Sequence, residues 1–340
     1  MKKHIAFSCK NAPCIAILET TANNPFLNAI LEKLLDYGIP HNRILRISLN
    51  RYSAETQRYT LPSGKTCSLR GLITQYRICG YVGPGNKFDI PPVWTGQIPT
   101  QPDEITLPPT TCQRFNFEAT WFKTLVSAGI PILTICGSTQ HLAYLSGYNM
   151  HYNIHHVSDT KHNPRHPLST ASVPMSPEQV FTLLQTETSH HDIVVTETNS
   201  LSYKLTGEHI SLPSFHNHAV STHKTQATTW GEHNYYLEPV AYDIAPTPTQ
   251  TAIVEILENK TQCPVILALQ GHPEATEKEP FFAGFVSAAH LYSFELSHNI
   301  VRHPAEKRTL RTFTKAESPE ERIQKIVSGA EVLKKAKIQA

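Results

Sequence analysis

One cysteine and one histidine–glutamate pair have the residue types that nucleophilic catalysis requires. Cys136 directly follows the apolar run 130–135 and directly precedes Gly137. This order predicts a strand that turns sharply into a helix, a corner that presents the sulfur and surrounds it with backbone NH groups that favour a thiolate. His272 follows a later apolar run and precedes Glu274 by two residues, so a carboxylate can orient the imidazole. The three side chains are therefore a candidate Cys–His–Glu set for nucleophilic catalysis, although a cysteine that ends a strand is more often a packed core residue.

The segments that must position these residues alternate between strands and helices. Apolar runs of strand length, each followed by a stretch with helical spacing, are typical of an α/β domain with a largely parallel sheet. We expect strands at 13–18, 43–47, 78–82, 130–135 and 265–269, helices at 24–35, 115–128, 137–145 and 280–296, and short antiparallel strands at 193–196 and 209–212. Residues 91–113, rich in Pro and Thr, read as a surface excursion. Open sheets of this kind bind ligands at the carboxyl ends of their strands.

Four segments resemble the class I glutamine amidotransferase-like family, and within it the γ-glutamyl hydrolase branch typified by γ-glutamyl-γ-aminobutyrate hydrolase. Residues 129–140 (GIPILTICGSTQ) are similar to the family's GIPVLGICRGMQ, and residues 269–274 (LQGHPE) to its VQFHPE. Residues 214–220 (SFHNHAV) are similar to SFHHQAV, which is typical of the hydrolase branch, and residues 80–85 (GYVGPG) resemble the family's strand and PGG turn. The resemblance implies a flavodoxin-like three-layer sandwich, with a mostly parallel central sheet and a small antiparallel excursion.

The resemblance also implies roles for individual residues. Cys136 would attack a γ-glutamyl amide, the NH groups of Gly85 and Gly137 would hold the oxyanion, and His272 would protonate the leaving amine. Gln140 matches a position that contacts substrate, and His216 would line the same pocket. No cofactor is implied, and the expected partner is a small γ-glutamyl amide.

The sequence departs from the family pattern around the nucleophile. Thr134 and Ser138 stand where the family has glycine, which predicts a more crowded corner, and Pro84 has no NH to donate to an oxyanion. Three interpretations stay open. The protein is a hydrolase, a glutaminase component that passes ammonia to a partner enzyme, or a degenerate member that binds a ligand or protein without turnover.

Composition and charge set the broad class. The chain has 340 residues, 40% of them hydrophobic, and a formal net charge of +2, so neither nucleic acid nor a membrane is indicated as a partner. Lys10 interrupts the N-terminal apolar stretch too early for a signal peptide, which predicts a cytoplasmic protein. We divide the chain into a hydrolase domain at 1–300 and a charged helical extension at 301–340. A homodimer, and a contact of the extension with another protein, are left open.

Cysteine and histidine spacing gives little reason to expect a metal. The seven cysteines include no C-x-x-C pair, and no carboxylate lies within either H-x₃-H pair, His151 with His155 or His162 with His166. We therefore predict no metal site and interpret the histidine-rich stretch, including residues 190–191, as solvated loop.

Overall fold

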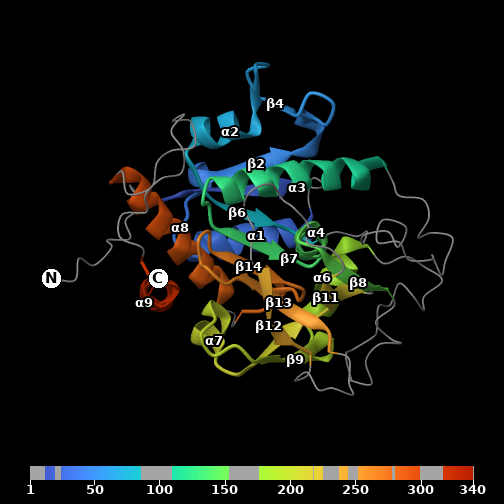
Figure 1. Ribbon diagram of the computed structural model, residues 1–340, viewed down its shortest axis with the longest axis vertical. Helices are drawn as coiled ribbons and strands as arrows, with labels where there is room; N and C mark the ends of the chain where they lie inside the picture. The colour runs from blue at the N-terminus through green and yellow to red at the C-terminus, as the bar shows by residue number, and fades with distance from the viewer. Residues whose placement is uncertain are drawn as a thin grey trace.

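The protein folds around one large sheet covered by helices on both faces. In this computed structural model the described residues are 12–19, 24–85, 109–152, 176–216, 218–224, 237–243, 252–277, 280–298 and 317–339. The main path of the sheet runs β10-β9-β12-β13-β14-β7-β6-β1-β2. In Figure 1 this sheet crosses the molecule, with β2 near the top and β9 near the bottom.

Five neighbouring strands of the sheet are parallel. They are β2 (Ile44–Ser48), β1 (Cys14–Glu19), β6 (Ile78–Gly83), β7 (Ile132–Ile135) and β14 (Ile266–Leu269). Almost every side chain on β1, β6, β7 and β14 is buried, as expected of parallel strands covered on both faces. The sequence identified each of these strands to within one or two residues, and the α/β fold class is confirmed.

The rest of the sheet is antiparallel. It comprises β13 (Val254–Asn259), β12 (Leu237–Tyr242), β9 (His190–Val195) and β10 (His209–Pro213), with β11 (His218–Lys224) and β8 (Tyr148–Tyr152) branching from β13. The predicted strands at 193–196 and 209–212 are confirmed as β9 and β10, which pair with each other. Strands β11, β12 and β13 were not predicted.

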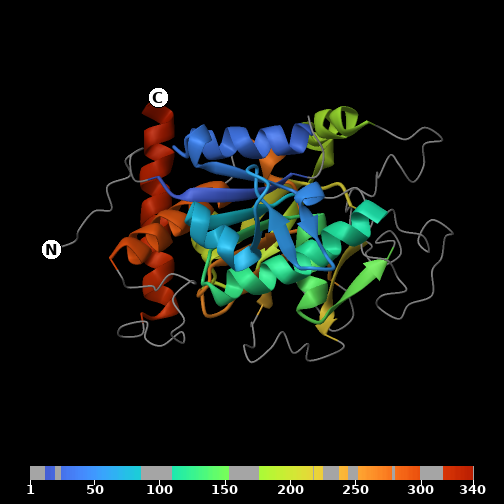
Figure 2. The same ribbon diagram turned by 90° about the horizontal axis from the view of Figure 1, so that it is seen from above.

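Helices pack on opposite faces of the sheet because side chains alternate along each strand. Ile15 and Ile17 belong to a core with α1 (Pro25–Asp36) and α8 (Phe281–Ser297), whereas Ala16 and Leu18 belong to a second core. That second core includes α2 (Leu69–Tyr76), α3 (Pro109–Ser127) and α4 (Gly137–Leu145). Figure 2 shows the resulting layers, with α1 above the sheet and α3 below it.

Several helices begin where the sequence supplies a cap. Asn24 accepts a hydrogen bond from the backbone N of Phe26 at the start of α1, and Pro25 follows at the first helical position. Ser68 caps α2 in the same way. The remaining short elements are α6 (Pro177–Leu184), α7 (Leu201–Thr206) and a three-stranded sheet of β3 (Tyr52–Ser53), β4 (Arg58–Thr60) and β5 (Thr66–Ser68).

The predicted C-terminal helix is present as α9 (Pro319–Gln339), and it packs against α8. Its inner side chains join the core beneath α8; these are Ile323, Ile326, Ala330 and Leu333. The buried Arg322 forms two hydrogen bonds with the carboxylate of Glu295 on α8, at 2.9 and 3.0 Å. Helix α9 is thus packed into the same core as α8. Among the helices that the structure describes, none is both long enough and apolar enough to cross a bilayer.

Candidate active site

Cys136 occupies the corner between β7 and α4. Its backbone has φ +48° and ψ −110°, a conformation that side chains with a Cβ rarely adopt. The corner is held on both sides, because the N–H of Cys136 donates to the carbonyl of Leu269 at 2.8 Å and its own carbonyl accepts from the N–H of Gln140 at 3.0 Å. Strained backbone of this kind clusters at functional sites, and it is the geometry of a nucleophile elbow.

His272 and Glu274 form a buried pair just beyond the end of β14. His272 Nδ1 lies 2.9 Å from Glu274 Oε1, and the two residues are 4% and 3% exposed. Burial alone would lower the pKa of His272, but the Glu274 carboxylate and negative charge at Cys136 raise it to about 10. The imidazole is therefore charged at neutral pH and stabilises a thiolate beside it. Within the described residues, Nε2 makes no hydrogen bond of ordinary geometry, which is common in the free state of enzymes.

The two glycines expected at the oxyanion position lie next to this pair. Gly137 is the first residue of α4, directly after the nucleophile. Gly85 follows β6, and a Cβ built on it would come within 3.1 Å of His272 Cε1 and 3.6 Å of Cys136 Cβ. Only a residue without a side chain fits there without displacing the imidazole. Strands β6, β7 and β14 are neighbours and parallel, so their carboxyl ends bring these residues to one edge of the sheet.

A chain of amide side chains reaches the sulfur of Cys136. Gln270 Nε2 donates to Cys136 Sγ at 3.8 Å, and Gln270 Oε1 accepts from Gln140 Nε2 at 3.4 Å. Gln140 Nε2 also donates to the carbonyl of His218 at 2.9 Å. That same carbonyl lies 2.9 Å from Nδ1 of His216. The structure therefore links the predicted residues Gln140 and His216 to Cys136, and it adds Gln270, which the sequence did not single out.

The residues that depart from the family pattern are accommodated by hydrogen bonds. The Thr134 and Thr139 hydroxyls lie 2.9 Å apart, and Thr139 donates to the carbonyl of Leu269 at 2.8 Å. Ser138 is fully buried beside Gly83, where an added Cβ would come within 2.6 Å of the Ser138 hydroxyl oxygen. The predicted crowding is real at Ser138, and the absence of a side chain on Gly83 makes room for it.

The described residues of the histidine-rich stretch are not simply solvated. His191 lies on β9, is 7% exposed, and has Nε2 3.2 Å from the Glu255 carboxylate on β13. The prediction of a solvated loop at 190–191 is therefore wrong, because β9 places the second histidine against a buried acid. Of the four histidines in the two H-x₃-H spacings, only His151, on β8, is among the described residues. Within the described ranges, no group of three His, Cys, Asp or Glu side chains could hold a metal ion.

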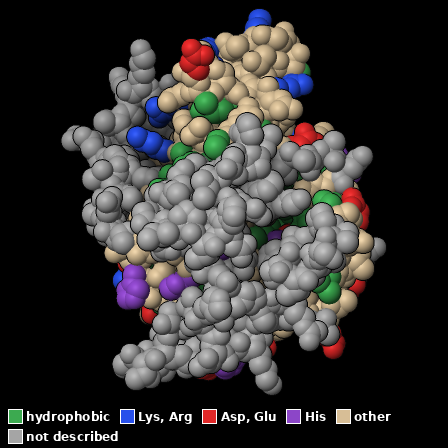
Figure 3. All heavy atoms as spheres, turned by 90° about the vertical axis from the view of Figure 1, so that its right-hand side faces the viewer, with side chains coloured by type: hydrophobic (Ala, Val, Ile, Leu, Met, Phe, Trp, Pro, Cys, Tyr) green, Lys and Arg blue, Asp and Glu red, His purple; other side chains and the backbone are tan. Residues whose placement is uncertain are grey.

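The rim of the site includes an aromatic contact that the sequence did not reveal. The ring of Phe26, on the first turn of α1, lies 5.4 Å from the His272 ring, centroid to centroid, and 5.3 Å from that of Phe181 on α6. Phe26 therefore helps to bury the imidazole. On the face in Figure 3, the blue Lys and Arg side chains of the described residues lie mostly in the upper half, and red Asp and Glu side chains lie near the top and along the right-hand edge.

The chain belongs to the Peptidase C26 family, which it matches over residues 71–274, more than half its length. The match supports the resemblance to class I glutamine amidotransferase-like hydrolases, while the γ-glutamyl hydrolase branch rests on the sequence segments alone. No curated protein matches the sequence.

Similar solved structures are distant in sequence. The glutaminase domain of Trypanosoma brucei CTPS with bound acivicin is 16% identical, with coverage of 84% of this chain and 93% of that one and a TM-score of 0.45. A glutamine amidotransferase from Methylobacillus flagellatus is 11% identical (96% and 94% covered, TM-score 0.40). A glutamine amidotransferase from Thermotoga maritima is also 11% identical (96% and 98% covered, TM-score 0.38).

Proposed function

We propose that the protein is a thiol-dependent hydrolase that cleaves γ-glutamyl amide bonds. The observation that carries the proposal is the strained backbone of Cys136, with φ +48°, at the sheet edge that also presents the hydrogen-bonded pair His272 and Glu274. A backbone with φ +48° and ψ −110° costs conformational energy, and strain of this kind clusters at functional sites. It supports a role in presenting the sulfur to a carbonyl carbon.

In the first half-reaction the Cys136 thiolate attacks the γ-carbonyl carbon of the substrate. Negative charge moves to the carbonyl oxygen, which the NH groups of Gly137 and Gly85 stabilise. The tetrahedral species collapses as the C–N bond breaks, and the His272 imidazolium gives its proton to the departing amine. A γ-glutamyl thioester and a neutral imidazole remain.

In the second half-reaction the neutral His272 removes a proton from water. The hydroxide equivalent adds to the thioester carbonyl, the C–S bond breaks, and glutamate leaves. The imidazolium and the thiolate are restored together. Glu274 stabilises the charged imidazole in both halves of the cycle because it bonds to the other ring nitrogen.

The γ-glutamyl specificity is supported by the amide chain beside the sulfur. Gln140 Oε1 is buried and makes no hydrogen bond to the described residues, so it can accept one from the α-ammonium group of a γ-glutamyl substrate. His216, in the hydrolase-type segment 214–220, is tied to the same carbonyl as Gln140. The leaving amine is not specified by these contacts.

The test is release of glutamate from glutamine and from a panel of γ-glutamyl amides. Cys136→Ala should reduce kcat by about 10³-fold or more, as expected for loss of a nucleophile. Cys67→Ala is the matched control, because Cys67 is a half-buried free thiol on β5. Glutamate release that is unaffected by Cys136→Ala would refute the nucleophile.

The other two interpretations predict different results. A protein that binds without turnover would release no glutamate from any amide. A glutaminase component would form ammonia from glutamine only after a second protein is added. A homodimer, a protein partner for residues 301–340 and a cytoplasmic location stay predictions from the sequence.

A further inference from the structure

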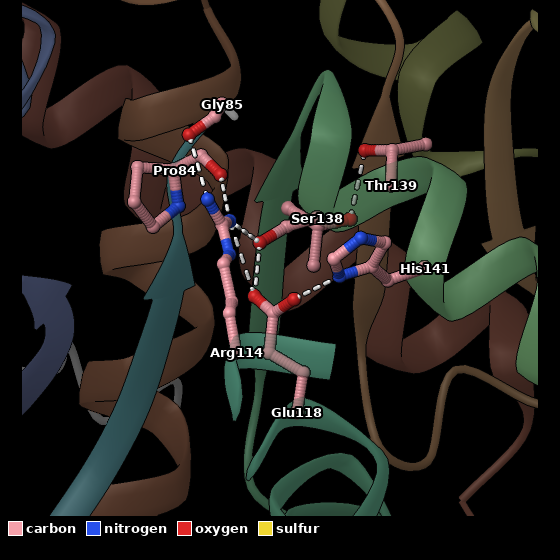
Figure 4. A network of polar contacts seen from close by, with 8 residues as sticks. Pro84, Gly85, Arg114, Glu118, Ser138, Thr139 and His141 are labelled. Atoms are coloured by element: carbon pink, nitrogen blue, oxygen red, sulfur yellow. Dashed lines mark hydrogen bonds and ion pairs between the residues drawn. The ribbon is translucent and has the colours of Figure 1, made fainter. Parts of the chain in front are cut away.

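A buried arginine lies directly behind the predicted oxyanion site. Arg114, on the first turns of α3, is 2% exposed and was not singled out by the sequence. Its guanidinium donates to the carbonyl of Pro84 at 2.6 Å and to that of Gly85 at 3.0 Å, and it also donates to the Ser138 hydroxyl at 2.7 Å. Figure 4 shows the guanidinium between residues 84–85 on one side and the start of α4 on the other.

These contacts fix the direction of one peptide group. The carbonyl of Pro84 and the N–H of Gly85 belong to the same planar trans peptide, so they point in opposite directions. Because the carbonyl points at Arg114, the N–H of Gly85 points away from Arg114. The Cα of Gly85 lies against Cys136 and His272, so the catalytic pair is next to this peptide.

The same guanidinium connects the two halves of the oxyanion site. Ser138 follows Gly137 on the first turn of α4, and its hydroxyl is bonded both to Arg114 and to Glu118. The planar guanidinium of Arg114 therefore sets the spacing between the peptide 84–85 and the start of α4, which carries the Gly137 N–H. Lysine could not reproduce this contact, because its ammonium lacks the planar fork of five donors.

A buried acid holds the arginine in place. Glu118 is fully buried and contacts Arg114, Ser138 and His141. Burial would raise the pKa of Glu118, but the Arg114 guanidinium, the neighbouring His141 and the hydrogen bonds to the carboxylate lower that pKa to about 2. The carboxylate is ionised at neutral pH, and it balances the charge of the guanidinium.

We propose that Arg114 is a positioning residue that orients the Gly85 N–H toward the oxyanion and holds it at a fixed distance from the Gly137 N–H. The inference rests on the proposed function in one respect, since it assumes that Cys136 attacks a carbonyl. It does not depend on the substrate being a γ-glutamyl amide.

Two reactions of Cys136 distinguish a loss of the oriented oxyanion donor from a general loss of folded structure or of thiol reactivity. Acylation by p-nitrophenyl acetate develops an oxyanion, whereas alkylation by iodoacetamide needs only the thiolate. Loss of one oxyanion donor costs about 10²- to 10³-fold. We expect Arg114→Lys to slow the Cys136-dependent acylation by ~10-fold or more, a partial loss of that donor, and to change alkylation by less than about twofold. Cys136→Ala gives the background for both reactions.

Arg322→Lys is the matched control, because Arg322 is also a buried arginine paired with a glutamate but lies on α9, away from the peptide 84–85. It should change neither rate. If Arg114→Lys does not fold, as judged by circular dichroism, Ser138→Ala replaces it. This variant keeps the charges of Arg114 and Glu118 but removes the hydroxyl to which Arg114 donates, and it should slow acylation without slowing alkylation.

Equal slowing of acylation and alkylation, or no slowing of either, would overturn the inference. So would the lack of any Cys136-dependent acylation in the unaltered protein. A selective loss of acylation in a protein that hydrolyses no γ-glutamyl amide would refute the proposed substrate and leave the role of Arg114 standing.

Discussion

Gln270 donates its side-chain amide to the sulfur of Cys136, at 3.8 Å, from the strand end that also delivers His272 two residues later. A neutral amide therefore contacts Cys136 from the same short segment that carries the His272 imidazole. The amide is held in turn by Gln140. A hydrogen bond to sulfur favours the thiolate over the thiol.

Replacement of Gln270 by methionine should weaken the thiolate. The change keeps the side-chain volume and removes the donor, and hydrogen bonds to charged groups contribute about 1.5 to 3 kcal/mol. Because the donor–sulfur distance is long, we expect the lower end, an alkylation rate at pH 7 reduced on the order of tenfold. Gln262→Met is the control, since Gln262 is a buried glutamine bonded to Glu258. An unchanged rate in Gln270→Met would exclude the contact as a source of reactivity.

Replacement of Glu274 by glutamine should change how reactivity depends on pH. The carboxylate raises the pKa of His272, so its loss favours the neutral thiol and imidazole over the ion pair. We expect iodoacetamide to react with Cys136 at least about tenfold more slowly at pH 7, equivalent to one pKa unit, and the difference to shrink as the pH approaches 10. Glu277→Gln, at an exposed carboxylate three residues further along the chain, should leave the profile unchanged.

The raised pKa of His272 also makes the free energy of unfolding depend on pH, in a defined range. Because the folded-state pKa of His272 is raised to about 10, its stabilising contribution is complete below about pH 6.5, the unfolded-state value, and is lost as the pH rises to 10. Glu274→Gln should flatten this alkaline loss in urea-unfolding measurements. A slope identical to that of the unaltered protein would contradict the assigned cause.

Truncation of Ile326 should destabilise the fold without altering the thiol. This side chain of α9 is fully buried in the core shared with α8, and Ile→Ala changes at such sites cost about 2 to 5 kcal/mol. Val332→Ala, at a residue of the same helix that is 48% exposed, should cost less than about 0.5 kcal/mol. Urea unfolding measures both, and the Cys136 alkylation rate should be the same in all three proteins. A small loss for Ile326→Ala would mean that α9 contributes little to the core.

The positions of the candidate catalytic residues could be predicted because their signal is local. Cys136 and His272 each follow a short apolar run, and the direct change from apolar run to turn marks the end of a buried strand. The position of Gly85 was predicted for the same reason, because a turn-rich segment containing it follows the apolar run 78–82. These three residues come from adjacent parallel strands, so a correct assignment of the strands was enough to place them at one edge.

The supporting residues could not be predicted because their burial arises from tertiary packing. Arg114 and Glu118 are four residues apart, a spacing that on a helix usually indicates an exposed ion pair. Only the packing of α3 against β6 and α4 buries them. Strand β13 was missed for a related reason. Its glutamates, Glu255 and Glu258, are 1% exposed, and acidic residues are depleted in strands.

The position of α9 also determines when a newly made chain can complete its fold. The strand that presents Cys136 leaves the ribosome early, whereas the segment carrying His272 and the residues that cover α8 are translated much later. Until residues 319–333 have emerged, the apolar side chains under α8 stay open to water and to other nascent chains. Because His272 follows Cys136 by 136 residues along the chain, the thiol and its base cannot be assembled until that later segment has emerged.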